Sequence, residues 1–173
     1  MLGALGLLMF EDIEKFNFTE SVNCKGPWLM YAKQLMKAAI DLESGENDPS
    51  QFLRPRIKLM LVAFAFENLF KALFIKHGGA IASDGKLVGI RVHPAHDLVQ
   101  IADCASVALT NDERDALRRL SHFGRFMGRY PSPNVWDEVQ EVVSGETFYI
   151  VPWSSATDDV LSNLFLRTLK DAS

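Results

Sequence analysis

Residues 59–75 read LMLVAFAFENLFKALFI, and this stretch decides the fold. Apolar side chains occupy nearly every side of the helix expected over residues 54–77, so that helix is predicted to be central, with neighbours around it. A run this apolar could be taken for a membrane span. However, Glu67, Asn68 and Lys71 lie within it, and charge is costly in lipid. We therefore predict a buried helix of a soluble protein, with no membrane as a partner.

Helical periodicity continues on both sides of this central segment. Thr110 and Glu113 have the capping-box spacing, which opens a helix that ends before Pro131. Other helical stretches are expected over residues 27–42, 94–108, 136–143 and 157–169. Residues 87–92 and 148–151 are β-prone and are able to pair with each other. The prediction is an all-α, up-and-down bundle of about five to six helices, with one long loop and room for a short β-hairpin.

Length and composition fit a single domain. The chain has 173 residues, of which 48% are hydrophobic, and this is enough for a substantial core. We divide it into an N-terminal arm (1–26), a core bundle (27–131), and an extension with the last helix (132–173). The apolar run over residues 1–10 is expected to form a helix or arm that packs on the core or on a partner. Two cysteines without CxxC spacing favour a reducing, cytoplasmic compartment.

The helix that follows Thr110 carries a basic stripe, although the net charge of −4 argues against a non-specific nucleic-acid coat protein. At about 100° per residue, its cationic side chains fall within an arc of roughly 80°. The stripe consists of Arg114, Arg118, His122, Arg125 and Arg129. Arginine forks suit a phosphate-bearing ligand, and His122 is the natural proton-transfer group. The alternative is a solvated face paired with carboxylates such as Asp115.

Two smaller polar groups also call for an explanation. Glu67 and Lys71 lie four residues apart on the most apolar helix, in the favourable order for an ion pair. They pair with each other or with the basic stripe, or they serve a ligand. His93, His96 and Asp97 suggest metal ligands, but a proline between the histidines favours a turn that keeps the rings apart. We predict no metal and no cofactor, and we expect Asp97 to begin a helix.

Three fragments of the chain, in this order, resemble the HEPN family. They are AFENLFKAL (65–73), HDLV (96–99) and GRYP (128–131), which match that family's E-x-x-x-K-A-L central helix, H-D-L helix start and late R-Y-P. The resemblance implies an up-and-down bundle of about four to five helices, often a homodimer. Members of the family include metal-independent ribonucleases of toxin and defence systems. Others are non-catalytic partners of nucleotidyltransferases or are regarded as small-ligand binders.

The ribonuclease branch of that family carries an Arg, then four to six residues, then a His, on or beside a late helix. Arg118 and Arg119 precede His122 with only three and two residues between, so the chain departs from the pattern there. Arg91 and His96 fit the spacing formally, but they lie in the loop before the third expected helix.

Three functions are compatible with the sequence. The favoured one is a non-catalytic HEPN-like domain that binds a nucleotide, RNA or a partner protein, as a homodimer. Its binding residues are expected to be the basic stripe together with Tyr130, Glu67 and Lys71. The second is a metal-independent ribonuclease in which His122 transfers a proton, while Arg118, Arg125 and Arg129 stabilise the transition state. The pair of Arg91 and His96 is a second candidate for these roles. The third is a structural subunit of an oligomer.

Overall fold

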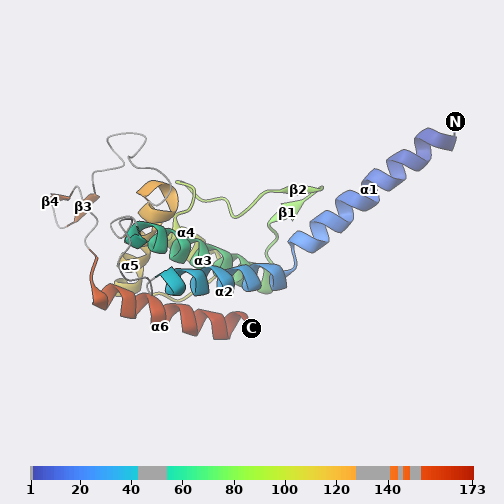
Figure 1. Ribbon diagram of the computed structural model, residues 1–173. Coiled ribbons are helices and arrows are strands. Elements are labelled where there is room, and N and C mark those ends of the chain that lie inside the picture. Colours follow the sequence, from blue (N-terminus) through green and yellow to red (C-terminus); the bar gives the residue numbers. More distant parts are fainter. Residues whose placement is uncertain (1, 43–53, 128–140, 144–145, 149–152) are drawn as a thin grey trace.

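The computed structural model describes the backbone of residues 2–42, 54–127, 141–143, 146–148 and 153–173, and the side chains within 12–42, 55–125 and 153–173. This part of the chain is a helical bundle with two short β-hairpins (Figure 1), and it confirms the all-α prediction. In chain order the elements are α1 (Leu2–Val22), α2 (Lys25–Asp41), α3 (Arg54–Lys76), β1 (Ala82–Ser83), β2 (Lys86–Leu87), α4 (Leu98–Cys104), α5 (Asn111–His122), the π-helix η3 (Phe123–Met127), β3 (Glu141–Val143), β4 (Glu146–Phe148) and α6 (Ser155–Ala172).

Helix α3 is the centre of the bundle, as its sequence predicts. Helices α2, α4, α5, η3 and α6 all pack against it. Its side chains Phe66, Leu69 and Phe70 are fully buried. The ring of Phe66 meets the edge of Phe165 on α6, with 5.4 Å between the ring centroids. Neighbouring helices therefore bury most of the apolar residues of α3, whereas Leu61, Phe64 and Ile75 stay partly exposed.

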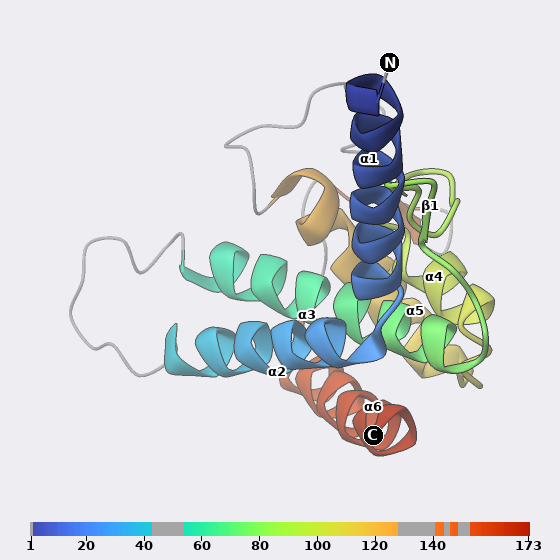
Figure 2. The same cartoon turned by 90° about the vertical axis from the view of Figure 1, so that its right-hand side faces the viewer.

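Helix α2 lies along α3, and α6 runs beneath the pair (Figure 2). Ala32 and Ala39 of α2 are fully buried. Because an alanine side chain is short, these positions allow the two helices to approach closely. The same core includes three side chains of α6, those of Leu161, Leu164 and Phe165. The last helix is thus an integral part of the hydrophobic core.

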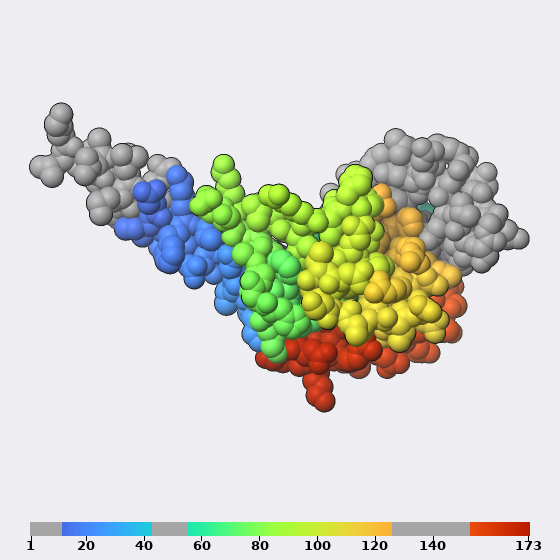
Figure 3. Space-filling model, turned by 180° about the vertical axis from the view of Figure 1, so that it is seen from behind, coloured from blue at the N-terminus to red at the C-terminus, as the bar shows by residue number. Residues whose placement is uncertain are grey.

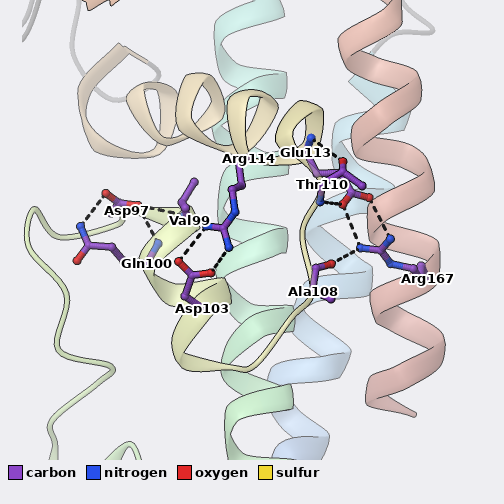
Figure 4. Close-up of polar contacts among 9 residues, drawn as sticks. All are labelled: Asp97, Val99, Gln100, Asp103, Ala108, Thr110, Glu113, Arg114 and Arg167. Atoms are coloured by element: carbon purple, nitrogen blue, oxygen red, sulfur yellow. Dashed lines mark hydrogen bonds and ion pairs between the residues drawn. The ribbon is translucent and has the colours of Figure 1, made fainter.

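The predicted capping box at the start of α5 is confirmed. The Thr110 hydroxyl accepts a hydrogen bond from the Glu113 amide (3.2 Å), and the Glu113 carboxylate accepts one from the Thr110 amide (2.8 Å). Arg167 of α6 donates to that carboxylate (3.2 Å) and to the carbonyl of Ala108 (2.8 Å), as Figure 4 shows. This arginine ties α6 to the beginning of α5.

The helix expected over residues 94–108 is shorter than predicted, because α4 covers only Leu98–Cys104. Asp97 begins it, as expected, and its carboxylate accepts hydrogen bonds from the amides of Val99 and Gln100, both at 3.0 Å. The residue before this cap, His96, has a positive φ of 65°, which is incompatible with a helix. Residues 94–97 therefore form a turn, and this turn sets the direction of the His96 side chain.

The predicted pairing of residues 87–92 with 148–151 is wrong for the residues that the structure describes. β2 pairs with β1, and β4 pairs with β3, so each strand takes the partner nearest to it in the chain. The helical interpretation of 136–143 is also wrong for Glu141–Val143, which form β3; the rest of that segment lies outside the described residues. Short loops favour such local hairpins because closing them costs little entropy.

Most of the N-terminal arm is a helix, α1, that extends from the bundle at an angle (Figure 1). The part of it drawn in blue in Figure 3 lies beside the β1–β2 hairpin. Its end contacts the β1–β2 hairpin, where the side-chain oxygen of Asn23 accepts from the amides of Ile81 (2.8 Å) and Ala82 (3.0 Å). Asn23 also donates to the carbonyl of Ala82 (3.0 Å). Within the ranges described, no helix combines the length and the apolar character needed to cross a membrane.

Replacing Phe66 with alanine is expected to lower the free energy of unfolding by about 3–5 kcal/mol, because the buried ring leaves a cavity at the centre of the bundle. Urea unfolding followed by circular dichroism measures this loss. Phe16→Ala is the matched control, since that phenylalanine is exposed, and it should change stability by less than about 0.5 kcal/mol. Equal effects of the two substitutions would contradict the central position of α3.

Candidate functional site

Two arginines of the basic stripe pair with carboxylates of the same chain. Arg114 forms a two-pronged pair with Asp103 of α4, at 2.7 and 3.0 Å, as Figure 4 shows. Arg118 pairs with Asp115, one turn away on α5. The Asp103 hydrogen bond raises the pKa of Arg114 above its usual value. For these two arginines, the structure agrees with the alternative prediction, a solvated face whose cations pair with carboxylates.

The stripe also changes geometry after His122. Helix α5 ends there, and residues Phe123–Met127 continue as the π-helix η3. A π-helix has more residues per turn, so the arc predicted from 100° per residue does not extend to Arg125. Arg129 and Tyr130 lie outside the described residues. Within η3, Gly124 packs against α3 so closely that an added Cβ would lie 3.1 Å from the Cβ of Ala63.

A polar cluster, formed by Glu67, Lys71 and His96, is the candidate site. The ammonium of Lys71 lies 2.7 Å from one carboxylate oxygen of Glu67, and Nδ1 of His96 lies 2.6 Å from the other. The exposed fraction of the side chain is 11% for Glu67, 17% for Lys71 and 34% for His96. The predicted ion pair on α3 is confirmed, and the structure adds a histidine from a loop that lies 29 residues away in sequence.

Glu67 keeps its negative charge in this buried position. Burial by itself raises the pKa of a carboxyl group, but here the attraction of Lys71 and the hydrogen bonds from Lys71 and His96 outweigh it. The pKa of Glu67 consequently lies below its usual value. The carboxylate is the anion that holds two cationic or potentially cationic groups in place.

Neighbouring aromatic rings complete the surroundings of the cluster. Phe64 meets the edge of the His96 ring, with 6.1 Å between centroids. Trp28 of α2 presents its ring face to Lys71, whose ammonium lies 5.0 Å from the ring centroid. The backbone of His96 is in the left-handed region, which is uncommon for residues other than glycine and is often found at functional sites.

The His96 turn is attached to the end of α5. The amide of Leu98, at the start of α4, donates to the hydroxyl of Ser121 (3.0 Å), which itself donates to the carbonyl of Leu117 (2.8 Å). Phe64, which contacts His96, also lies near Gly124 in η3. The structure therefore brings the turn, α3 and the junction of α5 with η3 together, and His122 and Arg125 belong to that junction.

The structure brings some of the predicted site residues together and separates the others. Glu67, Lys71 and His96 come together, whereas Arg114 and Arg118 are held by acidic neighbours. Arg91 and His93 are exposed on the loop that leads to the turn, and His122 is partly buried at the end of α5. In the described ranges, no three His, Cys, Asp or Glu side chains are placed to hold a metal ion. Sequence reasoning missed Trp28, Phe64 and Ser121, which had no signal beyond helical periodicity.

Comparisons with protein-family models, with curated proteins and with solved structures found no match for this chain.

Glu67→Gln should lower the free energy of unfolding at neutral pH by about 1–3 kcal/mol, because the charge that compensates Lys71 and His96 is lost. Since the pKa of Glu67 is lowered in the folded protein, its stabilising contribution is complete above the usual value of 4.5 and is lost as the pH falls below it. The variant should therefore lose less stability than the wild type upon acidification. Urea unfolding at several pH values from about 3 to 7, a range of about four pH units, measures both effects.

Asp115→Asn is the matched control for this experiment. Its carboxylate also pairs with a cation, Arg118, but both side chains are exposed. Such pairs contribute roughly 0–1 kcal/mol. A Glu67→Gln variant that unfolds like Asp115→Asn at every pH would show that the cluster does not carry a buried, ionised carboxylate.

Proposed function

We propose that the protein is a HEPN-type domain that binds a phosphate-bearing ligand, a nucleotide or RNA, on the surface around His96. The observation that carries this proposal is the convergence of three elements there. Glu67 and Lys71 come from α3, His96 comes from the turn before α4, and the end of α5 is attached to that turn by the Leu98–Ser121 hydrogen bond. The resemblance to the HEPN family rests on fragments that include all three members of the cluster.

The chemistry of His96 suits a phosphate oxygen. A carboxylate that accepts from Nδ1–H fixes the ring and leaves Nε2 for a ligand. A third of the side chain is exposed, so a ligand can reach it. When the imidazole is protonated, Nε2–H donates a charge-assisted hydrogen bond to the phosphate. Arg125 follows Ser121 by four residues, in η3, and we propose that its guanidinium binds the same ligand.

The basic face of α5 is a poorer place for the ligand than the sequence suggests. Arg114 and Arg118 already pair with carboxylates, and a phosphate would have to displace Asp103 and Asp115. The same pairs also weaken the proposal of a purely structural subunit, because these two arginines need no second chain to neutralise them. A homodimer stays part of the proposal, on the strength of the resemblance.

A second candidate function is a metal-independent ribonuclease, and the His96–Glu67 hydrogen bond of 2.6 Å favours it. A carboxylate bound to Nδ1 selects the tautomer in which Nε2 is a base, and it stabilises the imidazolium that forms when Nε2 takes a proton. His96 would accept the proton of the ribose 2′-hydroxyl as that oxygen bonds to the adjacent phosphorus. The bond from phosphorus to the 5′-oxygen would break at the same time, and the protonated imidazole or a water would give a proton to the leaving 5′-oxygen. Arg125 or Arg91 would stabilise the charge on the phosphate oxygens. Among the two histidines proposed from sequence, the geometry favours His96 over His122.

Labelled mixed-sequence RNA, incubated without added metal, tests both functions in one experiment. Fluorescence anisotropy measures binding, and a denaturing gel measures cleavage. His96→Ala should weaken binding by about tenfold, the loss of one hydrogen bond to a charged group, and should abolish any cleavage. ATP, as competitor, reports whether a nucleotide occupies the same surface.

Two matched controls make the result specific. His93→Ala removes an exposed histidine three residues from His96 and should leave binding unchanged. Arg125→Ala should weaken binding at low salt more than Arg114→Ala, whose guanidinium is held by Asp103. Equal losses from His93→Ala and His96→Ala, or RNA that a folded protein neither binds nor cleaves, would contradict the proposal.

A further inference from the structure

The cluster has a fourth member that belongs to neither α3 nor the His96 turn. Trp28 stands in the first turn of α2, and the ammonium of Lys71 lies 5.0 Å from its ring centroid. This distance is within the range, about 6 Å, over which an aromatic face attracts a cation. Tryptophan has the most favourable ring for this contact. The contact joins α2 to the polar cluster on α3.

The indole itself is held in place from outside the cluster. Its Nε1–H donates to the carbonyl of Val22 (2.8 Å), the last residue of α1. A buried or partly buried indole usually needs such a partner. The ring plane is therefore set by the junction between α1 and α2, independently of Lys71. It offers Lys71 a fixed surface.

Lys71 needs that surface because its side chain is flexible. A lysine side chain has many rotamers and prefers to keep its ammonium in water. Here only 17% of the side chain is exposed, and the ammonium contacts both the indole and the Glu67 carboxylate. The indole thus restricts Lys71 to the conformations that reach Glu67.

Each oxygen of Glu67 serves one partner, and this links Lys71 to His96. Oε1 accepts from Lys71, and Oε2 is the atom next to Nδ1 of His96. If Lys71 moved away, Oε1 would be a buried, uncompensated acceptor, and the carboxylate would turn, recruit water or take up a proton. Each of these responses changes the bond to His96.

We propose that Trp28 is a positioning residue of the His96 site: its ring face holds Lys71 against Glu67, and Glu67 in turn orients the His96 imidazole. The order of contacts is Val22 carbonyl, Trp28, Lys71, Glu67, His96. It begins at the end of α1 and finishes at the group that meets the ligand. The role given to His96 rests on the proposed function, but the chain of contacts can be measured without any ligand.

An acid titration of the full chain, followed by nuclear magnetic resonance, tests the proposal. The chemical shift of the Glu67 carboxyl carbon reports the pKa of that group. Trp28→Leu removes the ring and should raise the pKa of Glu67, because Lys71 is no longer held beside it. Trp28→Phe keeps a weaker ring face and should give an intermediate value. Lys71→Met, which removes the charge outright, should give the largest rise, about one unit or more.

Trp153→Leu is the matched control. Trp153 is also partly buried, packs against an aromatic ring (Phe123), and donates its indole N–H, in this case to Asp158. Its loss perturbs packing to a similar degree but should leave the pKa of Glu67 at the wild-type value. A purely structural role of Trp28 would move Glu67 no more than Trp153→Leu does, and this outcome would overturn the proposal.

A double-mutant cycle keeps the test decisive if Trp28→Leu does not fold. Trp28→Phe, Lys71→Met and the double variant are compared by urea unfolding. If the ring positions the ammonium, the two changes should be non-additive by at least about twofold in the unfolding equilibrium constant. Additive effects would overturn the proposal. Failure of RNA or ATP to bind the wild type would contradict the proposed function, and it would leave these two measurements valid.

Discussion

A carboxylate inside the most apolar helix is the constraint on which the site depends. Neighbouring helices pack against α3, and Glu67 lies on its buried side, so the carboxylate is taken out of water together with the core. A buried charge is tolerated only when it is paired and hydrogen-bonded. Lys71 satisfies one oxygen from the same helix, and His96 satisfies the other from a loop. To reach Glu67, the loop turns into the left-handed region at His96, and Asp97 then starts α4. The position of α4, and through Ser121 its attachment to α5, follows from this arrangement.

Local chemistry explains why much of the fold could be predicted. Periodicity identified α2, α3 and α6, and the spacing of Thr110 and Glu113 gave the beginning of α5. The predictions that failed concern features that depend on competition between segments. Pairing of β-prone stretches was assigned over long range, whereas the chain pairs them locally. The π-helix after His122 has no simple sequence signature, and close packing of Gly124 on Ala63 accompanies it. α4 begins late because of the turn at His96, which depends on a contact far away in sequence, and it ends early where Ser106 adopts a positive φ of 60°.

The same distinction applies to the site. The Glu67–Lys71 pair could be predicted, because four residues make one helical turn. The contact of Glu67 with His96 could not, since 29 residues separate them and only the fold brings them together. The basic stripe suggested a binding surface that the structure does not leave free at Arg114. The spacing of the stripe is real, but Asp103, on another helix, forms an ion pair with Arg114. A one-dimensional pattern shows which charges share a face and does not show what neutralises them.

The tautomer of the His96 ring is the most direct measure of this account, because every role given to the cluster requires Glu67 to accept from Nδ1–H. Two-bond nitrogen–proton correlation spectra of ¹⁵N-histidine protein distinguish the two neutral tautomers, with exposed His93 as the internal reference. We predict that neutral His96 carries its proton on Nδ1 in the wild type, and that Glu67→Gln shifts the ring toward the tautomeric mixture of His93. A wild-type His96 that carries its proton on Nε2, or that shows the same mixture of tautomers as His93, would contradict this prediction.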